Sequence, residues 1–176
     1  MAKTLKGYKA FRFGPTAADG GMGTALVAIG TTVKGNTTAS TSEATTQDFL
    51  IEEQSDPLES VVTEDPKLSG VLETYDVDPD TAVKICGGTV TTTGTGANKR
   101  KVYTPPAAYS PIEGSGEIES KNGGILSVVR MQLLPVWQFN FQDSELGKII
   151  INWKALAPTK AATGPWTLST PDPVTT

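Results

Sequence analysis

The C-terminal half of the chain alternates apolar and polar positions in a way that predicts a β-hairpin. Residues 125–141 are rich in branched and aromatic side chains, and Trp137, Phe139 and Phe141 alternate with polar neighbours. Residues 148–155 alternate in the same manner, with isoleucine and tryptophan on one face. Because apolar pairs across two antiparallel strands stabilise them, the two runs predict a hairpin with its aromatic face in the core.

Other segments also favour extended structure. Residues 48–53 place Phe49 and Ile51 on one face, and residues 60–77 read as two strands broken at Asp65-Pro66. Residues 89–106 read as a strand, a glycine-rich turn and a second strand. The sequence therefore predicts a mainly β fold, either an antiparallel β-sandwich or a partly open barrel, with one short α-helix and long loops.

Three carboxylates at alternate positions from Asp76 to Asp80 raise the question of a cation site. An EF-hand loop needs glycine at its sixth position and a bidentate glutamate at its twelfth, but Thr81 and Gly87 stand there. The calcium interpretation loses both its turn and its strongest ligand. No metal site and no cofactor are expected.

A two-turn helix accounts for the same residues better. Asp78 is placed to cap the helix, and Pro79 follows at the first helical position, where its missing N–H costs nothing. Gly87 is available for the left-handed residue that ends a helix. At helical spacing the apolar side chains share one face: Ala82, Ile85 and Cys86.

Composition excludes several kinds of chemistry. With no histidine, the chain has no Ser-His-Asp or Cys-His catalysis. A single cysteine, Cys86, allows no internal disulfide and no CxxC site. An enzyme built from carboxylates alone remains an alternative, and its candidate pairs would be Glu52-Glu53 and Glu117-Glu119. The N-terminus lacks the apolar core of a signal peptide, and no apolar run approaches the roughly 20 residues of a membrane span, so a soluble protein is expected.

Charge is unevenly distributed. The net charge is −4, which argues against a protein that wraps duplex DNA. Residues 43–80 hold twelve acidic residues and one basic residue, and the rest of the chain holds seven acidic and fourteen basic. The acidic segment is either a solvated face or a surface that meets a basic surface on a neighbouring copy. The candidate interface residues are Glu43, Glu52, Glu53, Glu59, Glu64 and Asp65 on one side, and Lys3, Lys6, Lys9, Arg12, Lys99, Arg100 and Lys101 on the other.

Three parts are expected along the chain: a loop-rich N-terminal segment (1–47), a β domain (48–157) and a Pro/Thr-rich tail (158–176) whose last residues lack a pattern. A loop of about thirty residues within the first part is uncommon in a compact domain. It is either flexible or ordered by lying across a neighbouring copy. In the second case it would bury three apolar residues on that copy: Leu26, Val27 and Ile29.

The order of these parts resembles the tail tube (major tail) proteins of long-tailed bacteriophages. A loop-rich first third is followed by the acidic strand pair "IEEQSDPLESVVTEDPKLSGVLETYDVD", the capped helix "PDTAVKICGG", and hairpins that lead to a long C-terminal strand pair. The resemblance covers about residues 48–157. It implies a β-sandwich subunit that forms hexameric rings, stacked head to tail into a hollow tube through which the genome passes without specific binding.

The same resemblance implies no catalytic residues, and a protein made in the host cytoplasm that ends in the virion tail. Its partners would be copies of itself and other tail proteins such as the tape measure and the terminator. Two alternatives stay open. One is another virion component, such as a tail terminator or a decoration protein. The other is a glycan-binding or adhesin-like module, suggested by Trp137, Trp153 and Trp166.

Overall fold

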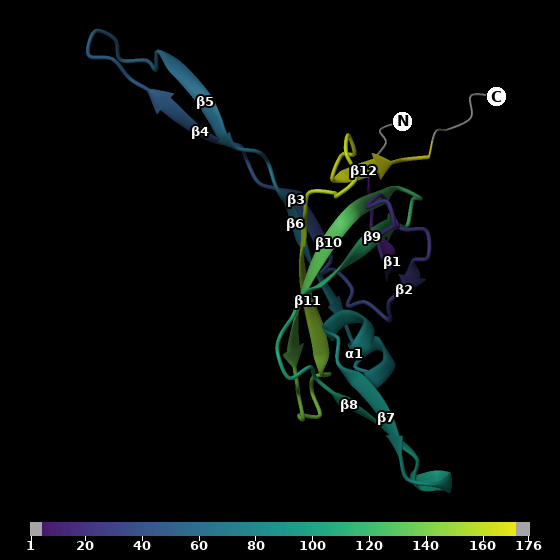
Figure 1. Ribbon diagram of the computed structural model, residues 1–176. Coiled ribbons are helices and arrows are strands. Elements are labelled where there is room, and N and C mark those ends of the chain that lie inside the picture. The colour runs from purple at the N-terminus through teal and green to yellow at the C-terminus, as the bar shows by residue number, and fades with distance from the viewer. Residues whose placement is uncertain (1–4, 172–176) are drawn as a thin grey trace, which may run out of the picture.

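The protein is mainly β, with antiparallel sheets and one α-helix, as the sequence predicts (Figure 1). The computed structural model describes residues 5–171. The large sheet contains β1 (Tyr8–Gly14), β2 (Val27–Ala28), β3 (Thr38–Thr41), β6 (Leu68–Thr74), β9 (Ile112–Ser120), β10 (Ile125–Gln138), β11 (Lys148–Ala155) and β12 (Trp166–Ser169). Two small sheets are the hairpins β4–β5 (Thr45–Phe49, Glu59–Glu64) and β7–β8 (Thr89–Thr93, Arg100–Thr104). The helices are α1 (Pro79–Cys86) and the 3-10 turn η1 (Gly96–Asn98).

The strands of the large sheet follow the order β2-β1-β9-β10-β11-β6-β3, with β12 added beside β10. Within residues 5–171 this path is open, because it begins at β2 and ends at β3 without pairing the two. The sheet is therefore not a closed barrel. No helix in the same residues is long and apolar enough to cross a membrane.

The predicted C-terminal hairpin is confirmed as β10–β11. The register sets Leu133 opposite Trp153 and Trp137 opposite Ile149. Pro135 comes after the last residue of β10 that pairs with β9, so it lies where β10 has no partner on that side and a missing N–H is tolerated. The core is formed by the apolar face of β11 together with β1, β6, β10 and α1. Its largest buried side chains are Trp153, Phe11, Leu72, Ile85, Met131 and Leu133.

Helix α1 begins and ends as expected. The Asp78 side chain accepts a hydrogen bond from the Asp80 N–H at 3.0 Å, and Pro79 is the first helical residue. Gly87 has a positive φ of 72°, but its ψ of −162° lies outside the left-handed helical region that the sequence suggested. Ile85 and Cys86 face the core, and burial raises the pKa of the Cys86 thiol to about 11, so the thiol is neutral.

The N-terminal segment is more integrated than the sequence suggested. Strand β1 pairs with β9 in the large sheet, and Phe11 and Phe13 are buried in the core. The boundary expected between residues 47 and 48 falls inside β4. The sheet thus takes strands from both of the parts that the sequence separates.

The loops that follow β1 are also fixed to their own chain. The Gly23 N–H donates to Ser115 Oγ at 2.8 Å, the Val33 N–H donates to the Glu73 carbonyl at 2.8 Å, and Lys160 pairs with Asp19 at 2.7 Å. Ile29 is buried in this chain's core, which corrects its expected place on a neighbouring copy.

The C-terminal tail contains a strand that the sequence did not indicate. Strand β12 pairs with β10, with Ile125 opposite Ser169 and Val128 opposite Trp166. Four residues with two apolar side chains are too short to show a period. The last residues of the tail, 172–176, lie outside the described residues, as does Lys3.

Candidate functional site

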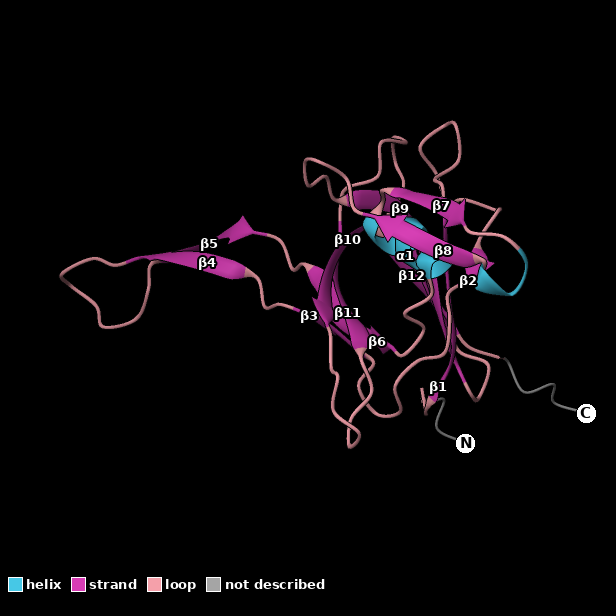
Figure 2. Cartoon of the chain, turned by 90° about the horizontal axis from the view of Figure 1, so that it is seen from below, coloured by secondary structure: helices cyan, strands magenta, loops and turns pink. Residues whose placement is uncertain are grey.

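The hairpin β4–β5 projects from the sheet as an arm. We call residues 43–65 the acidic arm. Figures 1 and 2 show it standing clear of the remaining strands. Every residue of β4 and β5 is exposed, and the two strands contact mainly each other. An isolated two-stranded hairpin is at best marginally stable in water. This hairpin therefore has the features of a segment that is stabilised by packing against another molecule.

The arm joins the large sheet through a narrow stem. Strands β3 and β6 pair with Thr41 opposite Leu68, and just beyond them the Ser42 N–H donates to the Lys67 carbonyl at 2.9 Å. The strand predicted over 48–53 ends at Phe49, and residues 50–58 form the loop at the arm's tip.

Charge on the arm is of one sign. Residues 43–65 include eight acidic residues and no basic one. Within residues 5–171, Glu64 alone among them forms an ion pair, with Lys67 at 2.9 Å, and this lysine lowers the pKa of Glu64. The other seven acidic side chains form no ion pair with any described residue, so the arm carries a strong negative potential.

The arm also exposes six large apolar side chains. Its large apolar residues, with their exposed fractions, are Phe49 (47%), Leu50 (68%), Ile51 (39%), Leu58 (62%), Val61 (42%) and Val62 (55%). Clustered exposed apolar side chains mark interaction surfaces more often than scattered ones do. The arm therefore combines an acidic and an apolar surface.

A hairpin of the reverse charge lies at the opposite end of the molecule. Figure 1 shows the hairpin β7–β8 pointing away from the arm. We call residues 89–104 the basic hairpin, because they contain Lys99, Arg100 and Lys101 and no acidic residue. Lys101 pairs with Asp80 at the start of α1, whereas Lys99 and Arg100 have no ion-pair partner among the described residues.

A row of aromatic rings lies next to the basic hairpin. Ring centroids are 5.5 Å apart between Tyr103 and Trp137, 5.3 Å between Trp137 and Phe139, and 6.5 Å between Phe139 and Phe141. We call these four residues the aromatic strip. Phe139 is 64% exposed and Phe141 94%, so their expected place in the core is wrong.

Two of the other predicted cations, Lys9 and Arg12, are already neutralised. Strand β1 pairs with β9, which brings Lys9 within 2.5 Å and Arg12 within 2.7 Å of Glu119. Lys9 and Arg12 are thus held within the chain and are not free cations for a neighbour. Lys6 remains exposed and forms no ion pair within the described part of the chain.

The carboxylate pairs considered for a hydrolase have little in common with a catalytic pair. Glu119 is held by Lys9 and Arg12, which lower its pKa, whereas a general acid needs a raised one. Glu117 lies 3.8 Å from Arg12. Glu52 and Glu53 are exposed at the tip of the arm. Residues 5–171 contain no group of three or more acidic, cysteine or histidine residues that could hold a metal ion.

The ion pairs of Glu119 predict a pH dependence of stability. Because Lys9 and then Arg12 lower its pKa in the folded state below the ordinary 4.5, Glu119 stabilises the fold above that value. This contribution is lost as the pH falls through the lowered pKa. In urea titrations at decreasing pH, Glu119→Gln should flatten the acid loss of unfolding free energy. The exposed and unpaired Glu52→Gln should reproduce the wild-type curve, and an equal flattening in both variants would contradict the assignment.

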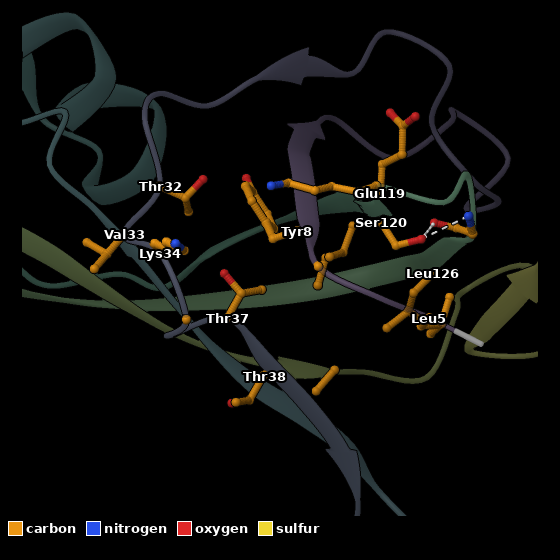
Figure 3. Close-up of a pocket in the computed structure, with 16 residues that line it drawn as sticks. Leu5, Tyr8, Thr32, Val33, Lys34, Thr37, Thr38, Glu119, Ser120 and Leu126 are labelled. Carbon is orange, nitrogen blue, oxygen red and sulfur yellow. Dashed lines mark hydrogen bonds between the residues drawn. The ribbon is translucent and has the colours of Figure 1, made fainter.

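A cavity of about 710 Å³ lies beside β3, at one end of the open sheet (Figure 3). Its walls come from β1, β9 and β10 on one side and from β3 and the loop before it on the other. The hydroxyl groups of Tyr8 and Thr37 are buried and form no hydrogen bond in the described residues. Sequence reasoning missed this cavity because its walls come from segments far apart in the chain.

Comparison with known proteins finds no family model that matches this chain and no significant match among curated proteins.

Proposed function

We propose that the protein is a structural subunit that assembles with copies of itself, as the tail tube proteins of long-tailed bacteriophages do. The observation that carries the proposal is the acidic arm, an unsupported hairpin with exposed apolar residues, set at the opposite end from a basic hairpin. The order of elements from 48 to 157 supports the choice of family. The subunits would form rings, in that family hexameric, stacked around a channel for genome passage.

The position of the two charged hairpins favours head-to-tail association. Two unlike surfaces at opposite ends of one subunit can pair head to tail, with the acidic end of one copy on the basic end of the next, and such heterologous contacts build rings or filaments. Each added copy leaves one acidic and one basic end free, so assembly continues until a ring closes or a tube grows. The net charge of −4 agrees with a channel to which passing DNA does not adhere.

The assembly is tested by reversing the charge of the arm. The triple variant Glu52→Lys, Glu53→Lys and Glu59→Lys should stay monomeric at concentrations at which the wild type forms rings or tubes. The reason is that like charges would then meet at the contact. Negative-stain electron microscopy and sedimentation velocity provide the measurement, and wild-type assembly should weaken with added salt.

A compensating variant provides the matched control. Adding Lys99→Glu and Arg100→Glu to the triple variant should restore assembly, while these two changes alone should abolish it. A wild type that stays monomeric at every concentration would refute the proposed function. Unchanged assembly and salt dependence in the triple variant would refute the pairing of the charges.

A glycan-binding module is the second candidate, and the aromatic strip is the observation in its favour. Exposed stacked rings such as those of Phe139 and Phe141 could lie against the apolar face of a sugar ring. Trp153 cannot take part, because it is buried. Glycan binding by a monomer that never assembles would select this function over the first.

A further inference from the structure

Phe139 and Phe141, the last two rings of the aromatic strip, lie outside the core of their own chain, whereas Tyr103 and Trp137 pack against it. Strand β10 ends at Gln138, opposite Lys148 at the start of β11, so Phe139 and Phe141 lie beyond the paired region. The rings form a nearly parallel row, with interplanar angles of 18° between Trp137 and Phe139 and 13° between Phe139 and Phe141. Leaving two phenylalanine rings in water is unfavourable, since removing apolar surface from water is the main favourable contribution to protein association.

The strip and the basic hairpin belong to one surface. Tyr103, the first ring of the strip, lies in β8, and the three cations Lys99, Arg100 and Lys101 precede it in the same hairpin. Figure 1 shows the loop between β10 and β11 at the same end of the molecule as β7–β8. This end therefore combines aromatic surface with two cations that form no ion pair among the described residues, Lys99 and Arg100, although the loop after Phe141 also holds Asp143 and Glu145.

The acidic arm carries the complementary pair of properties. Its apolar side chains include Leu50, Leu58 and Val62, each more than half exposed, and acidic residues lie among them. Burial of apolar surface supplies affinity, and opposite charges around it select the partner and its orientation. The arm thus complements the opposite end of the molecule both in apolar surface and in charge.

The strip cannot receive the arm of its own chain, since the two lie at opposite ends of the molecule (Figure 1). We propose that the aromatic strip is the docking site for the acidic arm of a second copy, with Phe139 and Phe141 contacting the apolar residues of the arm. The proposal rests on the proposed function, because it names the two surfaces through which the subunits associate. In this contact the aromatic rings, and not the charges alone, supply the affinity.

Substitution of Phe139 and Phe141 tests whether their rings supply the affinity of the contact. The double variant Phe139→Ser and Phe141→Ser should raise the concentration needed for assembly at least tenfold, because buried aromatic residues dominate interface energy. The monomer should stay folded with an unchanged melting temperature, since both rings are largely exposed. Tyr109→Ser serves as the matched control, since this ring is 63% exposed and lies outside the strip. Equal assembly of the double variant and the wild type would overturn the proposal.

Photo-crosslinking tests the contact itself. Benzoylphenylalanine placed at position 141 keeps an aromatic ring there and should crosslink, in assembled material, to peptides from residues 43–65 of a second copy. Denaturing gels would show covalent dimers, and mass spectrometry would identify the joined peptides. Rings or tubes that crosslink elsewhere would overturn the docking site while leaving the proposed function intact. Wild-type protein that never assembles would overturn both.

Discussion

Replacing residues 43–66 with an Asn-Gly turn should yield a folded monomer that no longer assembles at any concentration. In the wild type, Ser42 and Lys67 face each other across the stem, at the end of the paired strands β3 and β6. Asn-Gly favours the type I′ turn that joins two antiparallel strands through two residues. The shortened chain can therefore close the β3–β6 hairpin without moving the core.

This arm deletion separates assembly from folding. Strands β4 and β5 contribute none of the buried core, so the melting temperature of the monomer should change little. Sedimentation velocity and electron microscopy would measure assembly, and thermal unfolding followed by circular dichroism would measure stability. A control that keeps the arm but replaces Gln54 and Ser55 in its loop with glycine should assemble as the wild type does. Assembly of the deleted chain would contradict the role of the arm.

Trp153→Ala should cause a large loss of stability. Trp153 is 2% exposed, and in the core it lies opposite Leu133 and Gly70 on the strands at either side. Truncating a buried tryptophan to alanine costs about 3–5 kcal/mol, because it removes apolar burial and leaves a cavity. Urea unfolding followed by circular dichroism would measure the lower unfolding free energy.

Two further variants serve as controls for this value. Trp153→Phe keeps most of the buried volume and removes an indole N–H that has no hydrogen-bond partner in the described residues, so it should cost less than about 1.5 kcal/mol. Phe141→Ala changes a ring that is 94% exposed and should alter the free energy by no more than about 0.5 kcal/mol. Equal losses at positions 153 and 141 would contradict the assigned core.

Local patterns predicted the elements whose signals lie within a few residues of one another. The cap at Asp78, the proline after it and the apolar spacing of Ala82, Ile85 and Cys86 were enough to define α1. Strict alternation likewise defined the face of β11 that is buried. In both cases the physics is short-range, so a single sequence contains it.

The pairing of strands far apart in the chain could not be predicted from such local patterns. Phe11 and Phe13 alternate around Arg12, but seven residues cannot show that their partner is β9, more than a hundred positions away. The ion pairs of Lys9 and Arg12 with Glu119 follow from that register alone. The sequence could therefore identify these charges but not the fact that they neutralise each other.

The burial expected for the aromatic strip was wrong for a different reason. The alternation from Trp137 to Phe141 is genuine, but alternation indicates a shared face and not what covers it. Because β11 begins opposite Gln138, the two phenylalanines extend beyond their partner strand and remain exposed. What resembled core in the sequence is the surface that we propose for docking.

The stem beneath the arm bears on how a finished filament would respond to force. Two chain segments, at Ser42 and Lys67, are the covalent link between the arm and the sheet. Both segments are exposed, and the first buried side chain of β6 is that of Leu68, next to Lys67. A filament joined through such stems would curve by small rotations between rigid subunits, so its flexural stiffness would depend on the stems and not on the sheets.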